Sequence, residues 1–77
     1  MFNYTVEKTL ATIGSSGNSE KRLTVTSWNG NPAKLDLRTW RTVDGEQTPG
    51  KGMTLTNSEA AALCEALAEY LKGADNG

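Results

Sequence analysis

The sequence predicts an α+β domain in which four antiparallel strands form one sheet and a single C-terminal helix follows (ββββα). Three observations lead to this fold class. Residues 21–28 and 34–42 each alternate between apolar and polar side chains with the two-residue period of a strand. The Asn-Gly turn within residues 29–32 joins them as an antiparallel hairpin. From residue 56 onward, apolar residues recur every three or four positions, which indicates an amphipathic helix.

The other elements follow in chain order. Residues 2–13 are rich in β-branched and aromatic types and predict a first strand, bulged where its alternation slips. Residues 14–19 (GSSGNS) predict a turn, residues 43–50 (VDGEQTPG) a longer loop and residues 51–56 (KGMTLT) a short fourth strand. Thr56 and Glu59 have the spacing of a capping box at the helix start. Because 77 residues leave no room for a second core, we expect one domain over residues 1–77.

The predicted helix carries one apolar stripe. Its members, at i, i+3 and i+4 spacing, are Ala60, Leu63, Cys64, Leu67, Ala68, Tyr70 and Leu71. We expect this stripe to cover one face of the sheet and to bury Cys64 as a small hydrophobic side chain. Since a single helix covers one face only, the other face of the sheet is expected to stay open to solvent.

The expected open face combines aromatic, basic and small polar side chains. With the register of a simple hairpin, it carries Arg22, Thr24, Thr26, Trp28, Lys34, Asp36, Arg38 and Trp40. Cations neutralise phosphates, and flat rings stack on bases, whose faces are accessible only where strands are unpaired. We expect Asp36 to pair with Arg38 or with a cation on the neighbouring strand. This face therefore predicts binding of single-stranded nucleic acid without sequence preference.

The charge of the chain is segregated. The formal net charge is −1, yet residues 21–41 contain five cations and one carboxylate. Residues 57–77 contain one lysine and four carboxylates. Because binding depends on the local field of a patch, the basic segment favours a nucleic-acid partner despite the net charge.

The composition argues against several other classes of protein. With no histidine and one cysteine, the usual acid–base and nucleophilic sets of an enzyme cannot be assembled. For the same reason we expect no metal site, cofactor, small-molecule substrate or internal disulfide. The apolar runs are far shorter than the ~20 residues needed to span a bilayer, and no signal peptide opens the chain. We therefore expect a cytoplasmic protein that makes no membrane contact and could associate with the nucleoid.

Several motifs between residues 22 and 72 occur in a recognisable order. Trp28 precedes the Asn-Gly turn, residues 36–38 (DLR) are followed closely by Trp40, and residues 49–52 (PGKG) lead to residues 54–56 (TLT) and the helix. This ordered set resembles the positive cofactor 4 (transcriptional coactivator) family of single-stranded-DNA-binding domains, particularly its short bacterial and phage members. The resemblance implies a strongly curved sheet and a homodimer in which the helices pack at the interface and the sheets hold separated strands.

The resemblance also implies roles for individual residues. Carried over by position, stacking falls on Trp28 and Trp40, and contacts to the nucleic-acid backbone fall on Lys34, Arg38 and Lys51. Charge and strand geometry add the neighbouring cations Lys21, Arg22 and Arg41. The dimer interface is expected at Leu63, Leu67, Tyr70 and Leu71, because a chain this short has a thin core of its own. The turn at residues 29–33 (NGNPA) lacks the lysines common in the family's hairpin, which predicts fewer phosphate contacts.

The expected function is sequence-tolerant binding of single-stranded DNA by a homodimer, in transcription, replication or recombination. Two alternatives stay open. Exposed aromatic and arginine side chains also mark protein interfaces, so the chain could be a structural dimer module that docks a protein partner through Trp28 and Trp40. Single-stranded RNA could replace DNA, because no residue specifies a contact to the 2′-hydroxyl. Salt dependence separates nucleic-acid from protein partners, since release of counterions gives a slope of about −0.7 per neutralised phosphate.

Overall fold

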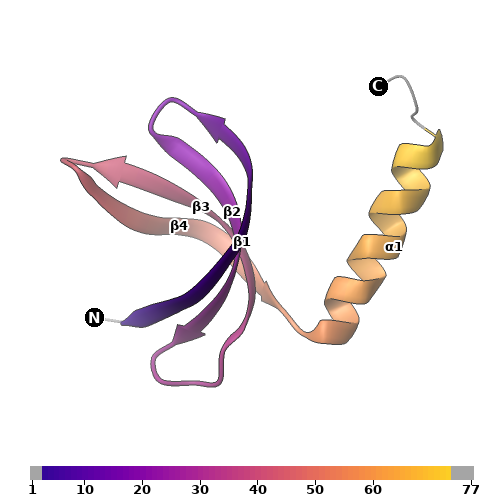
Figure 1. Ribbon diagram of the computed structural model, residues 1–77, viewed down its shortest axis with the longest axis horizontal. Helices are drawn as coiled ribbons and strands as arrows, with labels where there is room; N and C mark the ends of the chain where they lie inside the picture. Colours follow the sequence, from indigo (N-terminus) through magenta and orange to yellow (C-terminus); the bar gives the residue numbers. More distant parts are fainter. Residues whose placement is uncertain (1–2, 74–77) are drawn as a thin grey trace.

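The computed structural model describes residues 3–73, which form four strands followed by one helix (Figure 1). The strands are β1 (Tyr4–Ser16), β2 (Ser19–Trp28), β3 (Lys34–Val43) and β4 (Glu46–Leu55), and the helix is α1 (Asn57–Gly73). The strands lie in the sheet in chain order, and every neighbouring pair is antiparallel. The predicted fold class is thereby confirmed. Residue 2, which the sequence assigned to the first strand, lies outside the described residues.

Two of the hairpin turns have the backbone that Asn-Gly and Asp-Gly favour. In the turn between β2 and β3, Asn29 and Gly30 have φ values of 54° and 78°, as a type I′ turn requires. This confirms the predicted hairpin. Between β3 and β4, Asp44 and Gly45 have φ values of 53° and 81°. The long loop predicted for residues 43–50 is therefore wrong, because the chain reverses at Asp44-Gly45 and β4 begins at Glu46.

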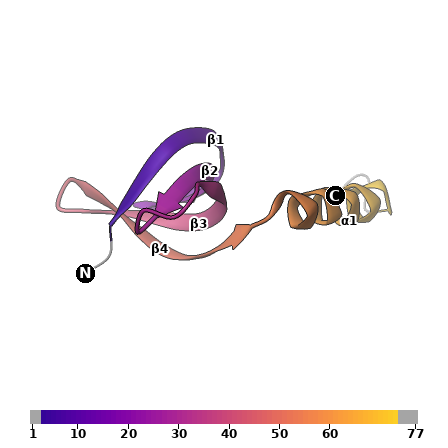
Figure 2. The same cartoon turned by 90° about the horizontal axis from the view of Figure 1, so that it is seen from below.

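Strand β1 is long and irregular. Its pairing with β2 shifts register at three places, between residues 6 and 8, 9 and 11, and 12 and 14, which confirms the predicted bulging. It also runs on to Ser16, so the predicted turn at residues 14–19 shrinks to Gly17 and Asn18. A β-bulge bends its strand and increases the local twist, and β1 arches over β2 and β3 in Figure 2. The sheet is consequently curled, with an inner and an outer face.

The pairing of β2 with β3 places the predicted face on the inner side of this curl. Arg22 lies opposite Arg38, and Thr24 lies opposite Asp36, so the register expected from the sequence is confirmed. Because residues that alternate along a strand share a face, the register defines one surface, which we call the inner face. It consists of Tyr4, Glu20, Arg22, Thr24, Thr26, Trp28, Lys34, Asp36, Arg38 and Trp40.

Much of the inner face is buried, contrary to the expectation from the sequence that this face stays open to solvent. Thr24, Thr26 and Asp36 are 0–1% exposed and Trp40 is 4% exposed, although the helix lies away from them (Figure 2). These side chains are buried because the sheet curls around them. Alternation predicts which residues share a face but not the direction in which a sheet bends, and the expected exposure was wrong for that reason.

The outer face carries the aliphatic side chains of the central strands. Leu23, Val25, Leu35 and Leu37 are half-buried there, and Met53, opposite Leu37 on β4, is 56% exposed. Water therefore reaches a surface that would normally be covered by a second layer. The usual arrangement of the two faces is inverted, with polar and aromatic groups inside and aliphatic groups outside.

The helix does not cover the sheet as the sequence predicted. It follows β4 after a single residue, Thr56, and extends away from the strands (Figures 1 and 2). None of its described residues is buried, and Cys64, expected to be buried, is exposed. A one-residue connection gives the helix no room to turn back onto the sheet, so its apolar stripe faces solvent in the isolated chain.

The start of α1 is the predicted capping box. The Glu59 backbone N–H donates to Thr56 Oγ1 at 3.1 Å, and the Thr56 backbone N–H donates to Glu59 Oε1 at 2.8 Å. These reciprocal bonds satisfy two donors at the helix end. The helix therefore begins where its sequence signal places it.

The chain is less compact than a domain of its length that is stable alone. Its radius of gyration is 14.2 Å, whereas about 11.5 Å is typical of a compact 77-residue domain. The excess reflects the projecting helix, and it leaves two apolar surfaces, the outer face of the sheet and the helix stripe, without a covering layer.

Candidate nucleic-acid interface

A continuous row of rings and cations crosses the inner face. The Arg38 Cζ atom lies 4.4 Å from the centroid of the Trp28 ring, and the Trp28 and Tyr4 rings are 5.2 Å apart. The Tyr4 ring is in turn 5.6 Å from that of Trp40, over which the Arg22 Cζ atom lies at 5.7 Å. We call this row the aromatic ladder. Cation–π contacts and tilted ring contacts at such distances are attractive, so each ring helps to fix its neighbour.

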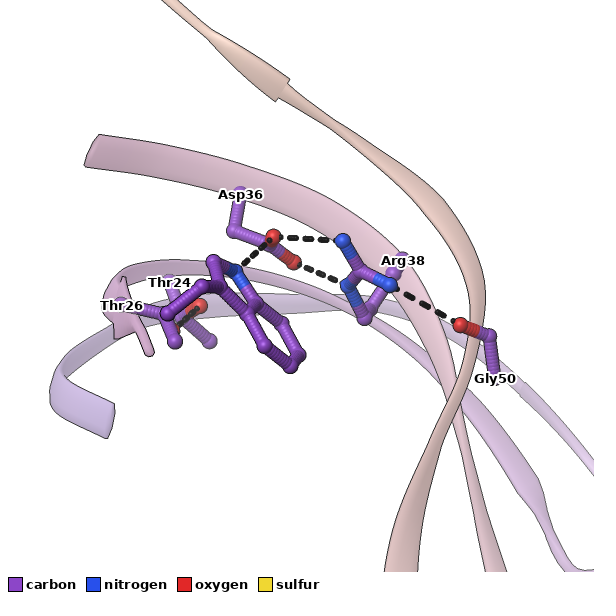
Figure 3. Close-up of polar contacts among 6 residues, drawn as sticks. Thr24, Thr26, Asp36, Arg38 and Gly50 are labelled. Carbon is purple, nitrogen blue, oxygen red and sulfur yellow. Dashed lines mark hydrogen bonds and ion pairs between the residues drawn. The ribbon is translucent and has the colours of Figure 1, made fainter. Parts of the chain in front are cut away.

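One end of the ladder is fixed by the buried carboxylate of Asp36. It accepts a hydrogen bond from Trp28 Nε1 at 2.9 Å and two from Arg38, from Nε at 2.6 Å and Nη2 at 2.8 Å. The remaining guanidinium nitrogen, Nη1, donates to the Gly50 carbonyl at 3.0 Å, and Figure 3 shows Arg38 between Asp36 and Gly50. Beside them, the hydroxyls of Thr24 and Thr26 form a buried hydrogen bond of 2.7 Å. Three strands are thus joined by one charged network.

The other end of the ladder is held by a more exposed pair. Arg22 Nε donates to Glu20 Oε1 at 2.8 Å, and Arg22 Nη1 donates to Gln47 Oε1 at 3.0 Å. The Glu20 side chain is 40% exposed, whereas that of Asp36 is fully buried. Water weakens exposed ion pairs, so Arg22 is held less firmly than Arg38.

Glycines on β4 make room for the Arg38 side chain. Gly52 lies directly opposite Arg38, and a Cβ atom at position 52 would overlap Arg38 and come within 2.5 Å of the Leu37 carbonyl oxygen. The predicted motif at residues 49–52 therefore has a structural role in this chain. Its glycines let β3 and β4 approach closely where the charged network crosses between them.

The two tryptophans are placed differently. Trp28 is half-buried and is oriented by its hydrogen bond to Asp36. Trp40 is 4% exposed, and its Nε1 has no hydrogen-bond acceptor among the described residues, so it is positioned by packing and by its contacts with Tyr4 and Arg22. In the isolated chain Trp40 belongs to the interior of the curl, and its stacking on a base stays a prediction.

The predicted cations divide between the two faces. Arg22, Lys34 and Arg38 lie on the inner face. Alternation along β2 and β3 places Lys21 and Arg41 on the outer face. Lys51 also lies on the outer side, where it and Lys21 line a hollow of about 360 Å³ together with Ile13, Leu37, Arg38, Thr39 and Met53. The structure therefore does not bring all the predicted binding residues onto one surface.

The cations also differ in their availability to an anion. Arg22 and Arg38 are engaged in ion pairs. Within residues 3–73, the structure records no ion pair for Lys21, Lys34 or Lys51, or for Arg41, and all four side chains are exposed. The exposed cations are thus the groups that could neutralise phosphates without losing a partner.

Two members of the site were missed in the sequence. Tyr4 links the two indoles, and Glu20 holds Arg22. Tyr4 was missed because β1 is bulged, and the alternation of a strand cannot be extended through a register shift. The second could have been found, since Glu20 and Arg22 are two residues apart on one strand, as Asp36 and Arg38 are.

The structure is thus a ββββα domain whose curled sheet carries a ladder of rings and arginines, with exposed cations on both of its faces. Residues 16–66 match the sequence profile described as Transcriptional Coactivator p15 (PC4), and the chain belongs to this family. It is also 40% identical over 67 residues to an uncharacterized protein of Treponema pallidum (strain Nichols). That match covers 86% of this chain and 76% of the relative. The resemblance inferred from the sequence is therefore confirmed.

Two further findings concern the part of the chain that is described. No helix in it is long and apolar enough to cross a membrane. No group of three or more Cys, Asp or Glu side chains in residues 3–73 comes together in a way that could hold a metal ion.

Proposed function

We propose that this protein binds single-stranded DNA without sequence preference, as a homodimer. The main support is the aromatic ladder, in which three rings lie in a row along one face of the sheet and an arginine lies over the ring at each end. The family to which the chain belongs is known for binding single-stranded DNA. Ring faces tolerate any base, because every base has a π surface.

The accessible end of the ladder is where bases would stack. Trp28 and Tyr4 are half-buried, whereas Trp40 is nearly inaccessible. Stacking of a base on an aromatic side chain contributes about 1–3 kcal/mol. Trp28 is therefore the main stacking residue in this proposal, with Tyr4 beside it.

The phosphates would follow the exposed cations. Lys34 lies on the inner face, and Lys21, Arg41 and Lys51 lie on the outer side of the same strands. A single strand is flexible enough to pass from one face to the other around the edge formed by β4. This path uses four cations that have no ion pair in the described residues and leaves the paired arginines in place.

The homodimer is supported by the apolar surfaces that the isolated chain exposes. The proposed interface residues on the helix are 37–69% exposed: Leu63, Leu67, Tyr70 and Leu71. The aliphatic outer face of the sheet is also incompletely covered. A second copy would bury both surfaces by the hydrophobic effect, at about 25 cal/mol per Å² of apolar area removed from water.

The proposal is tested by the anisotropy of labelled oligo-dT, with duplex DNA and oligo-U as competitors, between about 50 and about 200 mM salt. If Lys21, Lys34, Arg41 and Lys51 each neutralise one phosphate, the slope of log K against log salt is about −3 per protomer. Equal competition by duplex, or binding that salt does not affect, would contradict the proposal. Stronger competition by oligo-U than by oligo-dT would show that the protein prefers single-stranded RNA to single-stranded DNA. Sedimentation equilibrium of the same sample tests the homodimer.

A further inference from the structure

Asp36 is a fully buried carboxylate in a very small domain. Its side chain is 0% exposed, and it accepts three hydrogen bonds from two side chains. Burying a carboxylate is unfavourable even when it is paired, and apolar side chains of similar size often stabilise a fold as well or better. Stability alone is therefore a poor explanation for this network, which suggests a role in binding.

The network fixes one ring and one cation relative to each other. Trp28 comes from β2, and both Asp36 and Arg38 come from β3. The indole cannot rotate without breaking the bond from Nε1 to Asp36, and the guanidinium cannot move without breaking two bonds to Asp36 and one to Gly50. With the Arg38 Cζ atom 4.4 Å from the ring centroid, the guanidinium covers one side of the indole.

We propose that Asp36 is a positioning residue for single-strand binding, which orients Trp28 for stacking and withholds Arg38 from the phosphates. This inference rests on the proposed function. In the free protein Asp36 already holds the indole in its binding orientation, with Arg38 over one side of the ring and Tyr4 beside it, so that the indole does not have to be ordered when a base stacks on it. It also neutralises the charge of Arg38, which therefore acts as a cap on the ring instead of the backbone contact expected from the sequence.

The two parts of this role have separable effects on binding. Stacking does not depend on counterions and dominates the affinity at high salt, whereas phosphate contacts determine the slope of log K against log salt. Asp36→Asn removes the charge at nearly constant shape. It should lower the affinity for oligo-dT extrapolated to high salt by about tenfold, because the amide has one acceptor oxygen in place of two and its NH2 group cannot accept from Arg38, so that the ring is held less firmly. It should also steepen the slope by about 0.7, because Arg38 becomes free to contact one phosphate.

Glu65→Gln is the matched control. It makes the same change of charge at an exposed position of α1, outside the ladder. Its high-salt affinity should equal that of the wild type. A purely structural role of Asp36 would lower the melting temperature and the fraction of active protein without making the slope steeper.

A double-mutant cycle tests whether Asp36 acts through the indole. Trp28→Phe keeps a flat ring but removes the Nε1 donor, so adding Asp36→Asn to it should cause little further loss of high-salt affinity. If Asp36→Asn does not fold, Trp28→Phe alone decides the question, because it keeps a flat ring but removes the Nε1 donor that Asp36 holds. A reduced high-salt affinity of this variant supports the inference, and an unchanged one overturns it.

The failure of this inference is distinguishable from failure of the proposed function. If the wild-type protein does not bind oligo-dT, both are overturned. If the wild type binds and Asp36→Asn binds with the same high-salt affinity and the same slope, only the positioning role is overturned.

Discussion

A methyl group at position 52 has no room between β3 and β4. Gly52 lies opposite Arg38, and a Cβ atom there would overlap that side chain and approach the Leu37 carbonyl oxygen to 2.5 Å. Relief requires the two strands to move apart where Arg38 also bonds to the Gly50 carbonyl. The blocking atoms are the Leu37 carbonyl oxygen and the Cα and Cβ atoms of Arg38, which no change of rotamer can move.

The cost of Gly52→Ala can be worked from these contacts. Overpacking a tight site costs about 1–3 kcal/mol, and the loss of one hydrogen bond across the strands adds about 1 kcal/mol. Alanine also reduces the conformational entropy of the unfolded chain, which stabilises the folded state by less than about 1 kcal/mol. We therefore expect a loss of about 1–3.5 kcal/mol, which is a large part of the ~4–12 kcal/mol typical of a domain of this length.

Urea unfolding followed by tryptophan fluorescence measures this loss, with all variants at one protein concentration because the proposed homodimer makes stability concentration-dependent. Gly14→Ala is the control, since no atom lies within 4 Å of its added Cβ. Its stability should change by less than about 0.5 kcal/mol. A Gly52→Ala protein as stable as the control would refute the close approach of Arg38 to β4.

Four other substitutions separate the roles assigned above. Trp28→Ala should weaken oligo-dT binding by about 1–3 kcal/mol in an anisotropy titration while the chain stays folded. Trp40→Ala should instead destabilise the fold by about 3–5 kcal/mol in urea, because it empties the interior of the curl; a stable variant would place that ring at the surface. Lys34→Ala should make the salt slope shallower by about 0.7, and an unchanged slope would exclude a phosphate contact there. Leu67→Glu should sediment as a monomer if the helices form the interface, and a persistent dimer would move the interface elsewhere.

The sequence predicted the central hairpin and the helix start correctly because both depend on local chemistry. Alternation fixed the register that pairs Thr24 with Asp36, and the side chains of Thr56 and Glu59 form the expected cap. The early start of β4 was missed because its first half contains Pro49 and Gly50, which are poor strand formers. An edge strand tolerates them, since one side of its backbone has no partner strand.

The curl of the sheet and the place of the helix could not be predicted in the same way. Which way a sheet bends depends on bulges such as those of β1 and on close approaches such as that at Gly52, which alternation does not encode. As a result Trp40, expected at the surface, lies inside. The apolar stripe of α1 indicates that the helix packs against something, but the stripe alone does not say whether that is its own sheet or a second chain.

The most direct test of single-strand binding at the inner face is the intrinsic tryptophan fluorescence during titration with oligo-dT, repeated at two salt concentrations and with duplex DNA. Trp28 is the half-buried indole of the ladder, so a base stacked on it should quench its emission. We predict strong quenching that weakens with added salt and is slight with duplex. An emission spectrum that stays unchanged at saturating oligonucleotide would contradict the account and leave the ladder as a purely structural feature.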